Sequence, residues 1–187
     1  MIMGGKVHEL KISEIKAKAG ELKAGDRVIL SGTIYTSRDA AHKRLFEILD
    51  AGGELPFDIE GAVIYYAGPT PGKDGRPVGA CGPTTSSRMD GFAPRLLDLG
   101  LGAMIGKGER NEAVEQAIIR NGAVYFCAVG GAGALVAKHI VSAEEIAFAD
   151  LGCESVKRIE IEEMPLTVAI DCSGGNIFRD ERAKYKR

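Results

Sequence analysis

The chain has 187 residues, of which 45% are hydrophobic and 27% are charged, with 25 Gly and no Trp. This composition is typical of a globular protein, and we predict a single domain over residues 1–187 with a charged tail at 179–187. The net charge of −2 offers no positive field, so we expect no nucleic-acid partner. No apolar run approaches the roughly 18 residues of a membrane span, and the N-terminus lacks an apolar signal sequence. We therefore expect a cytoplasmic protein that does not enter a membrane.

The cysteines show no spacing that is typical of a zinc site or a C-x-x-C motif. Three of the four lie in or beside apolar segments, where a free thiol behaves as a small hydrophobic group. We predict reduced, structural cysteines that bind no metal, namely Cys81, Cys127, Cys153 and Cys172.

The first half of the chain begins with an expected edge strand at 7–12 and one or two helical turns at 13–19. The first strong strand covers 26–36 and is rich in β-branched residues. A helix follows from Asp39 and ends at Gly52–Gly53, and its predicted apolar face consists of Ala40, Leu45, Ile48 and Leu49.

A short apolar strand at 62–66 leads into residues 68–83, which are dense in Gly and Pro. This composition predicts a long loop or an irregular hairpin, and a loop of this length in a compact domain is usually functional.

The second half of the chain is predicted to contain helices at 84–97 and 111–121 and strands at 103–105 and 123–129. A Gly-rich turn at 130–133 precedes a short helix, and two further strands are expected at 156–161 and 166–170. Mixed strands and helices predict an α/β fold in which a mixed, partly parallel sheet is flanked by helices.

Three cations, Arg38, Arg88 and Lys107, each follow an apolar strand and a turn and lie at or near a predicted helix start. A helix start exposes unpaired N–H groups and the positive end of the helix dipole, so a cation there is unfavourable without a nearby anion. Three such placements predict an anion site built from converging turns. The alternatives are surface pairs, Arg38 with Asp39 and Arg88 with Asp90, and a solvated Lys107.

Four consecutive hydroxyl residues, Thr84 to Ser87, precede Arg88. One hydroxyl is enough to cap a helix, so the run indicates either a cap with polar neighbours or a cradle for a carboxylate or phosphate. The segment lacks the Gly-Lys-Ser/Thr ending of a Walker A loop. His42 lies one turn into the first long helix, where an exposed or capping role is commoner than a catalytic one.

Several motifs, in this order, resemble the β subunit, or C-terminal domain, of the class I fumarases. The most specific are Ser37-Arg38-Asp39-Ala40-Ala41-His42, Gly82-Pro83-Thr84-Thr85 and Gly106-Lys107-Gly108. These enzymes are iron–sulfur hydro-lyases, a group that includes the L-tartrate dehydratases. The resemblance implies a swivelling β/β/α domain of the aconitase type. It also implies a 4Fe–4S cluster that is bound by three cysteines of a larger α subunit and not by this chain.

The same resemblance implies roles for five residues. Arg38, Arg88 and Lys107, together with Thr85, are expected to bind a small dicarboxylate, and Thr84 is the proposed base that removes the C3 proton. The expected activity is the reversible hydration of fumarate to L-malate, in a heteromer with the α subunit. The alternatives are a subunit of L-tartrate or another 2-hydroxy dicarboxylate dehydratase, a non-catalytic phosphate- or anion-binding module, and an assembly domain. Homodimer formation by the isolated chain stays open.

Overall fold

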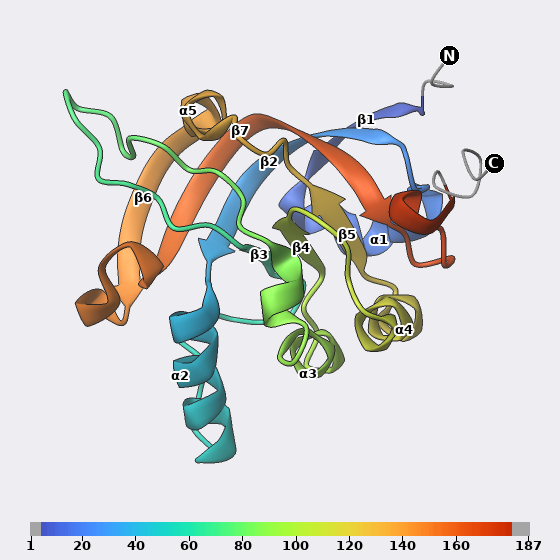
Figure 1. Cartoon of the computed structure of the whole chain (residues 1–187), viewed down its shortest axis with the longest axis horizontal. Coiled ribbons are helices and arrows are strands. Elements are labelled where there is room, and N and C mark those ends of the chain that lie inside the picture. The colour runs from blue at the N-terminus through green and yellow to red at the C-terminus, as the bar shows by residue number, and fades with distance from the viewer. Residues whose placement is uncertain (1–4, 181–187) are drawn as a thin grey trace.

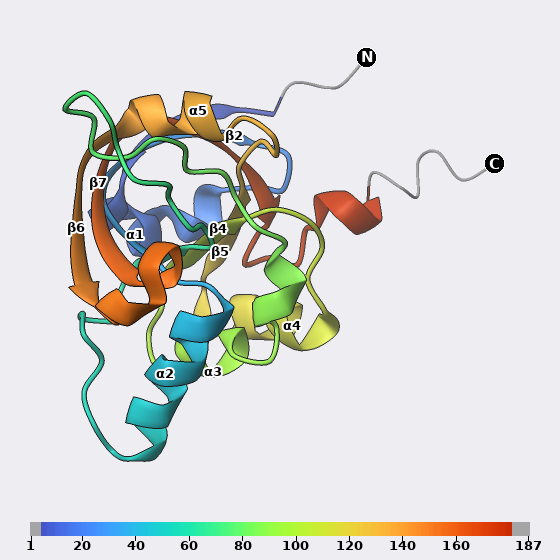
Figure 2. The same ribbon diagram turned by 60° about the vertical axis from the view of Figure 1, so that its left-hand side comes forward.

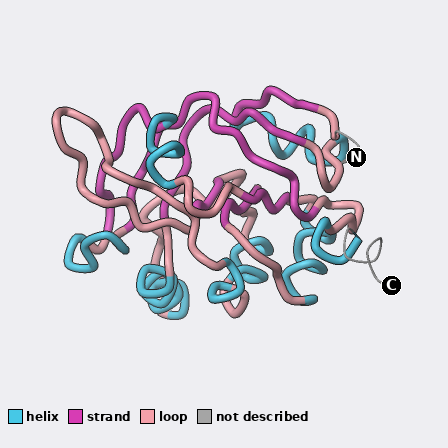
Figure 3. The backbone as a smooth tube through the Cα atoms, turned by 45° about the horizontal axis from the view of Figure 1, so that its top comes forward, coloured by secondary structure: helices cyan, strands magenta, loops and turns pink. Residues whose placement is uncertain are grey.

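The computed structural model describes residues 5–180, in which strands and helices form three stacked layers (Figure 1). The first layer contains β1 (Val7–Lys11), β2 (Arg27–Thr36), β6 (Ile140–Ala147) and β7 (Val156–Ile170). The second contains β3 (Val63–Tyr65), β4 (Ala103–Gly106) and β5 (Val124–Cys127). The third consists of α2 (Asp39–Asp50), α3 (Ala93–Asp98) and α4 (Glu112–Asn121), which lie beneath the strands in Figure 3. The predicted mixed sheet with flanking helices is confirmed, and the layers follow the order sheet, sheet, helix.

The strands form one mixed sheet in the order β1-β2-β3-β4-β5-β7-β6. Strands β1 to β5 pair in parallel, whereas β7 runs antiparallel to β5, β6 and β2. Because β7 pairs with β2 as well as with β5, the five strands β2, β3, β4, β5 and β7 close into a ring. Figure 2 shows β7 curving beside β6 around this ring.

Alternate residues of the short parallel strands pack into two separate apolar cores. Val63 and Tyr65 face the core inside the ring of strands, whereas Ile64 faces the core beneath the helices. Strands β4 and β5 alternate in the same way, since successive side chains of a strand point to opposite faces. Burial on both faces explains why these strands read as continuous apolar runs.

The C-terminal strands differ from the prediction. One continuous strand of 15 residues, β7, replaces the two strands expected at 156–161 and 166–170. The break in the pattern is a β-bulge, in which residues 162 and 163 of β7 lie opposite the single residue Ser31 of β2. Glu163 has a positive φ of 50°, and its N–H donates to Ser31 Oγ at 2.9 Å. Strand β6 was not predicted, because only one residue of this edge strand, Ile140, is buried and its sequence carries little apolar alternation.

Two expected helices also differ. The single helix predicted at 84–97 is a 3₁₀ turn, η3 (Ser86–Met89), followed by α3. Between them lies Asp90, whose buried carboxylate accepts from Arg110 and from the Asn111 N–H instead of continuing a helix. Helix α2 begins as predicted, but its fully buried residues are Ala41, His42 and Leu45.

No helix within residues 5–180 is long and apolar enough to cross a membrane. Of the charged tail predicted at 179–187, residues 181–187 lie outside the described part of the chain.

Helix α4 provides a test of local stability. Asn111 is its N-cap, and the side-chain Oδ1 accepts from the Val114 N–H at 3.0 Å. Asn111→Ala should lower the free energy of unfolding by about 1 kcal/mol because that N–H loses its acceptor. Asn111→Ser, which keeps a capping oxygen, should lower it far less. Urea unfolding measures both, and an equal loss in the two variants would contradict the capping role.

Candidate functional site

The predicted site residues converge on one edge of the sheet, where the parallel strands end. The register pairs Thr36 of β2 with Tyr65 of β3, and Gly106 of β4 with Cys127 of β5. The turns that follow these strands therefore leave the sheet side by side. Arg38 follows β2 and Lys107 follows β4. In sheets with parallel strands, ligands commonly bind at the carboxyl ends of the strands.

The segment that contains Thr84 and Thr85 crosses this same edge. The Thr84 N–H donates to Tyr66 O at 2.7 Å, just after β3. Ser86 and Lys107 exchange hydrogen bonds, from Ser86 N–H to Lys107 O at 2.9 Å and from Lys107 N–H to Ser86 Oγ at 3.0 Å. The backbone therefore fixes the two threonines beside the turns after β3 and β4.

Most of the hydroxyl run is not used for capping. Thr85 is the N-cap residue of η3, yet its side chain caps nothing. Ser86 is buried, and its Oγ accepts from the Tyr125 hydroxyl at 2.8 Å. Within the described residues, the hydroxyls of Thr84, Thr85 and Ser87 have no hydrogen-bond partner. The expected side-chain cap is therefore not formed at Thr85, and the cradle stays a prediction.

Two of the three cations are paired, but not with the carboxylates expected from the sequence. Arg38 Nη2 lies 3.3 Å from Glu154 Oε1, and Arg88 Nε donates to Asp39 Oδ1 at 2.9 Å. Asp90, the expected partner of Arg88, instead binds the buried Arg110 at 2.6 Å. The pairing of Arg88 with Asp39 brings the start of α2 and η3 together, so the two arginines become neighbours.

Lys107 carries the third positive charge and has no ion pair among the described residues. Its side chain lies against the turn after β5, where a Cβ on Gly130 would be 3.6 Å from Lys107 Cδ. The Gly-rich turn at 130–133 therefore lies close to the Lys107 side chain. The edge carries three cations, Arg38, Arg88 and Lys107, and two carboxylates, Asp39 and Glu154. These five side chains sum to one positive charge, which suits an anion.

The helix-start argument holds for Arg38 only. Arg38 is the N-cap residue of α2, whereas Arg88 is inside η3 and Lys107 precedes α4 by five residues. The cations are brought together by the sheet edge and not by helix dipoles.

Arg110 lies behind the site and was not predicted from the sequence. Its guanidinium is buried with Asp90 and stacks over the rings of Tyr66 and Tyr125, at 5.3 and 5.0 Å from their centroids. The sequence around Arg110 is polar and does not indicate burial, because its partners Asp90, Tyr66 and Tyr125 come from other segments of the chain.

His42 is also buried. The sequence favours an exposed or capping position for this residue. Its Nδ1 lies 2.9 Å from Arg38 O and 2.8 Å from Ser37 Oγ, and its ring packs on Tyr66. Because a carbonyl can only accept, Nδ1 carries the proton. Burial lowers the pKa of His42 from 6.5 to about 4, and the charge of Arg110 acts in the same direction. His42 is therefore a neutral support for the turn that carries Arg38.

The cysteines are dispersed. Cys81 is buried, and burial raises the pKa of its thiol to about 12, whereas Cys153 is exposed. All four are free, and residues 5–180 contain no group of three or more His, Cys, Asp or Glu that could hold a metal.

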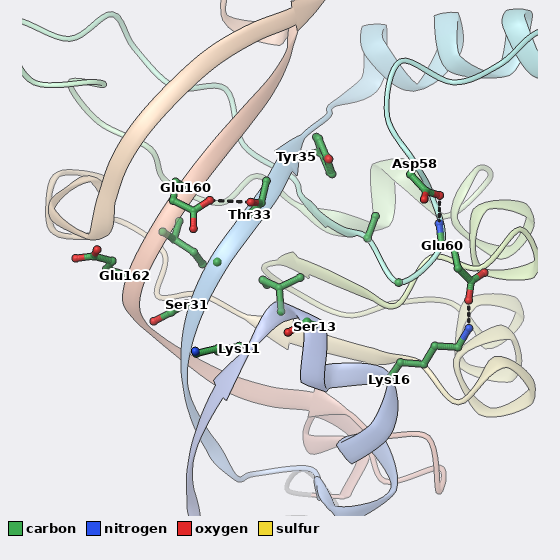
Figure 4. A pocket seen from close by; sticks show the side chains of 15 residues that line it. Lys11, Ser13, Lys16, Ser31, Thr33, Tyr35, Asp58, Glu60, Glu160 and Glu162 are labelled. Atoms are coloured by element: carbon green, nitrogen blue, oxygen red, sulfur yellow. Dashed lines mark hydrogen bonds and ion pairs between the residues drawn. The ribbon is translucent and has the colours of Figure 1, made fainter.

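A pocket of about 800 Å³ lies elsewhere, beside the amino end of β3 (Figure 4). None of the predicted site residues lines it. Its carboxylates outnumber its two lysines, and Glu60 already pairs with Lys16. The pocket is therefore poorly suited to an anion.

The neutral state of His42 predicts a pH dependence of stability. The unfolded chain takes up a proton near pH 6.5, whereas the folded chain does so only near pH 4. The free energy of unfolding should therefore fall between pH 7 and 4, with His42 contributing a loss on the order of 3 kcal/mol. Urea unfolding across this range should show a shallower pH dependence for His42→Gln. An identical dependence in both proteins would contradict a depressed pKa.

Comparison with known proteins identifies the family of the chain. The family model "Fumarase C-terminus" matches residues 4–181. The anaerobic class I fumarate hydratase of Escherichia coli is 38% identical over 171 residues, which cover 90% of this chain and 31% of that protein. The mitochondrial fumarate hydratase 1 of Leishmania major is 39% identical over 154 residues, or 81% of this chain and 28% of that protein.

A shorter relative matches almost from end to end. The putative L(+)-tartrate dehydratase subunit beta of Methanocaldococcus jannaschii is 37% identical over 175 residues, which cover 90% of each chain. The fumarate hydratases, by contrast, are about three times as long as the region they share with this chain. The chain therefore belongs to the Fumarase C-terminus family.

Proposed function

We propose that this chain is the β subunit of an iron–sulfur hydro-lyase that interconverts fumarate and L-malate. The observation that carries the proposal is the edge of the sheet where Arg38, Arg88 and Lys107 follow turns that lie beside the segment 84–87, three of whose hydroxyls have no partner among the described residues. Such an edge suits a small dicarboxylate, and the relatives named as fumarate hydratases share this region of sequence.

The cations hold the substrate in this proposal. Arg38, Arg88 and Lys107 bind the carboxylates in this proposal. Thr85, which forms a parallel bridge with Lys107, donates a further hydrogen bond from its hydroxyl to the substrate. Loss of the C3 proton places extra negative charge on the adjacent carboxylate as it takes the aci form. Cations that are already in position stabilise this charge without reorganisation.

Thr84 is the proposed base. Its backbone is fixed by the hydrogen bond to Tyr66 O, and its hydroxyl is left without a described partner. A Thr hydroxyl is a poor base, so it needs a cationic neighbour and a group that accepts its proton. Arg88 lies four residues further along the chain and provides the positive charge, and we assign the proton acceptor to an acidic residue of the partner subunit.

The partner in this proposal is a larger α subunit. We place the 4Fe–4S cluster there, where it would act as a Lewis acid on the leaving hydroxide. The name of the archaeal relative, a subunit beta, supports a heteromer. An exposed apolar side chain in the turn after β5 also favours coverage by a partner, since Val129 is 70% exposed. We expect the complex to be cytoplasmic.

A second candidate is the dehydration of L-tartrate or another 2-hydroxy dicarboxylate. The end-to-end match to the archaeal tartrate dehydratase subunit favours it. Both reactions require cations for two carboxylates and a base for one proton, so the described residues suit either substrate.

Anaerobic co-expression with the cluster-binding subunit tests the proposal. The purified complex should interconvert fumarate and L-malate, and a panel with L-tartrate and other 2-hydroxy dicarboxylates distinguishes the two candidates. Each chain alone should be inactive. A cluster-loaded complex that acts on no dicarboxylate would contradict the proposal and favour a binding module, which titration with phosphate or nucleotide would then reveal.

Arg88→Ala in the complex should lower kcat/KM by a factor on the order of 10²–10³, because a cation aimed at the developing charge is lost. Arg120→Ala is the matched control, since Arg120 is 47% exposed, pairs with Asp98 and lies in the last turn of α4, which leads to the amino end of β5 and not to its carboxyl end. Steady-state kinetics should show near-normal activity for the control. Equal activity in both variants would indicate a role in assembly rather than in catalysis.

A further inference from the structure

Glu154 is a distant residue that holds the start of helix α2. It belongs to η5 (Ala149–Glu154), between β6 and β7. One oxygen, Oε1, lies 3.3 Å from Arg38 Nη2, and the other, Oε2, accepts from the Ala40 N–H at 3.2 Å. A single carboxylate therefore binds both the side chain of the N-cap residue and the backbone of the first helical turn.

Helix α2 requires such a partner because its own sequence gives it no cap. Arg38 occupies the N-cap position, where an acceptor side chain would normally satisfy a free N–H, and it makes no capping hydrogen bond. A positive side chain at this helix end is also opposed by the helix dipole. The carboxylate of Glu154 offsets both effects, since it accepts from the helix backbone and neutralises the cation.

Gly68 confines the guanidinium from another side. A Cβ at position 68 would lie 2.9 Å from Arg38 Nη1 and 3.1 Å from Cys153 O, next to Glu154 in the chain. These distances are too short for an added methyl group unless the arginine or the loop moves. Arg38 is only 21% exposed as a result, and its Nε is buried without a described partner. The guanidinium is held in one place, with unused donors.

We propose that Glu154 is a positioning residue for Arg38, with Gly68 as the surface against which it is held. This proposal rests on the proposed function, in which Arg38 binds a carboxylate of the substrate. Because the Arg38 side chain is already immobilised before the substrate arrives, less conformational entropy is lost on binding. Glu154 itself touches no substrate.

Three variants of the complex separate positioning from simple stabilisation. Glu154→Gln keeps an oxygen for the Ala40 N–H but removes the charge beside Arg38, and Glu154→Ala removes both. Gly68→Ala keeps the Glu154 carboxylate but crowds the guanidinium of Arg38. Glu144→Gln is the matched control, because Glu144 of β6 forms an exposed pair with Arg158 of β7.

All three variants should raise KM for the dicarboxylate by about tenfold, the scale of one weakened charged contact, with a smaller effect on kcat. The control should match the wild type. A purely structural role would instead lower the melting temperature of Glu154→Ala and leave KM unchanged in all three variants, which would overturn the proposal. An inactive wild-type complex would contradict the proposed function and not this inference.

A second readout on the full chain is independent of activity. The Arg38 Nε–H should give a sharp, slowly exchanging NMR signal in the wild type, because the buried group is immobile. The signal should broaden or exchange rapidly in Glu154→Gln and Glu154→Ala, and it should shift in Gly68→Ala. An unchanged signal in the Glu154 variants would show that this carboxylate does not order Arg38.

Discussion

The parallel register of β2, β3, β4 and β5 is the constraint on which the proposed site depends. Both faces of these strands are buried, with Val63 and Tyr65 in one core and Ile64 in the other. A slip of one residue would move every side chain to the opposite face, so the apolar pattern fixes the register strongly. The same register sets where each strand ends, and therefore where Arg38 and Lys107 leave the sheet. The apolar pattern of these strands therefore determines both the packing of the core and the positions of the cations.

Cations gathered at one edge repel one another and need compensation before a ligand binds. At an effective dielectric constant of about 20, two unit charges 4 Å apart interact by about 4 kcal/mol. The fold provides two carboxylates, Asp39 at the start of α2 and Glu154 from the loop between β6 and β7. They order the arginines, and Lys107 has no ion partner among residues 5–180. The edge is thus stable as a protein surface while it retains an excess positive charge for an anion.

The sequence predicts the parts of the molecule that local patterns determine. Strands β2 to β5, the starts of α2 and α4, and the gathering of Arg38, Arg88 and Lys107 follow from periodicity, turn chemistry and the family resemblance. The long β7, the burial of His42 and Arg110, and the role of Glu154 do not. Each depends on a partner distant in sequence, and Ala40 and Glu154, for example, are 114 positions apart. Single-residue propensities contain no such information. The helix-dipole argument selected the same three cations as the family resemblance, but its reason applies only to Arg38.

The central claim is that a dicarboxylate binds at the carboxyl edge of the parallel strands. An NMR titration of the ¹⁵N-labelled chain with L-malate tests it most directly, with uncharged 1,4-butanediol as the control ligand. The account predicts that the amide shifts caused by malate concentrate at Arg38, Thr84, Thr85 and Lys107 and are absent with the diol. Shifts that concentrate instead around the pocket beside the amino end of β3, lined by Lys11, Lys16 and Glu160, would contradict it.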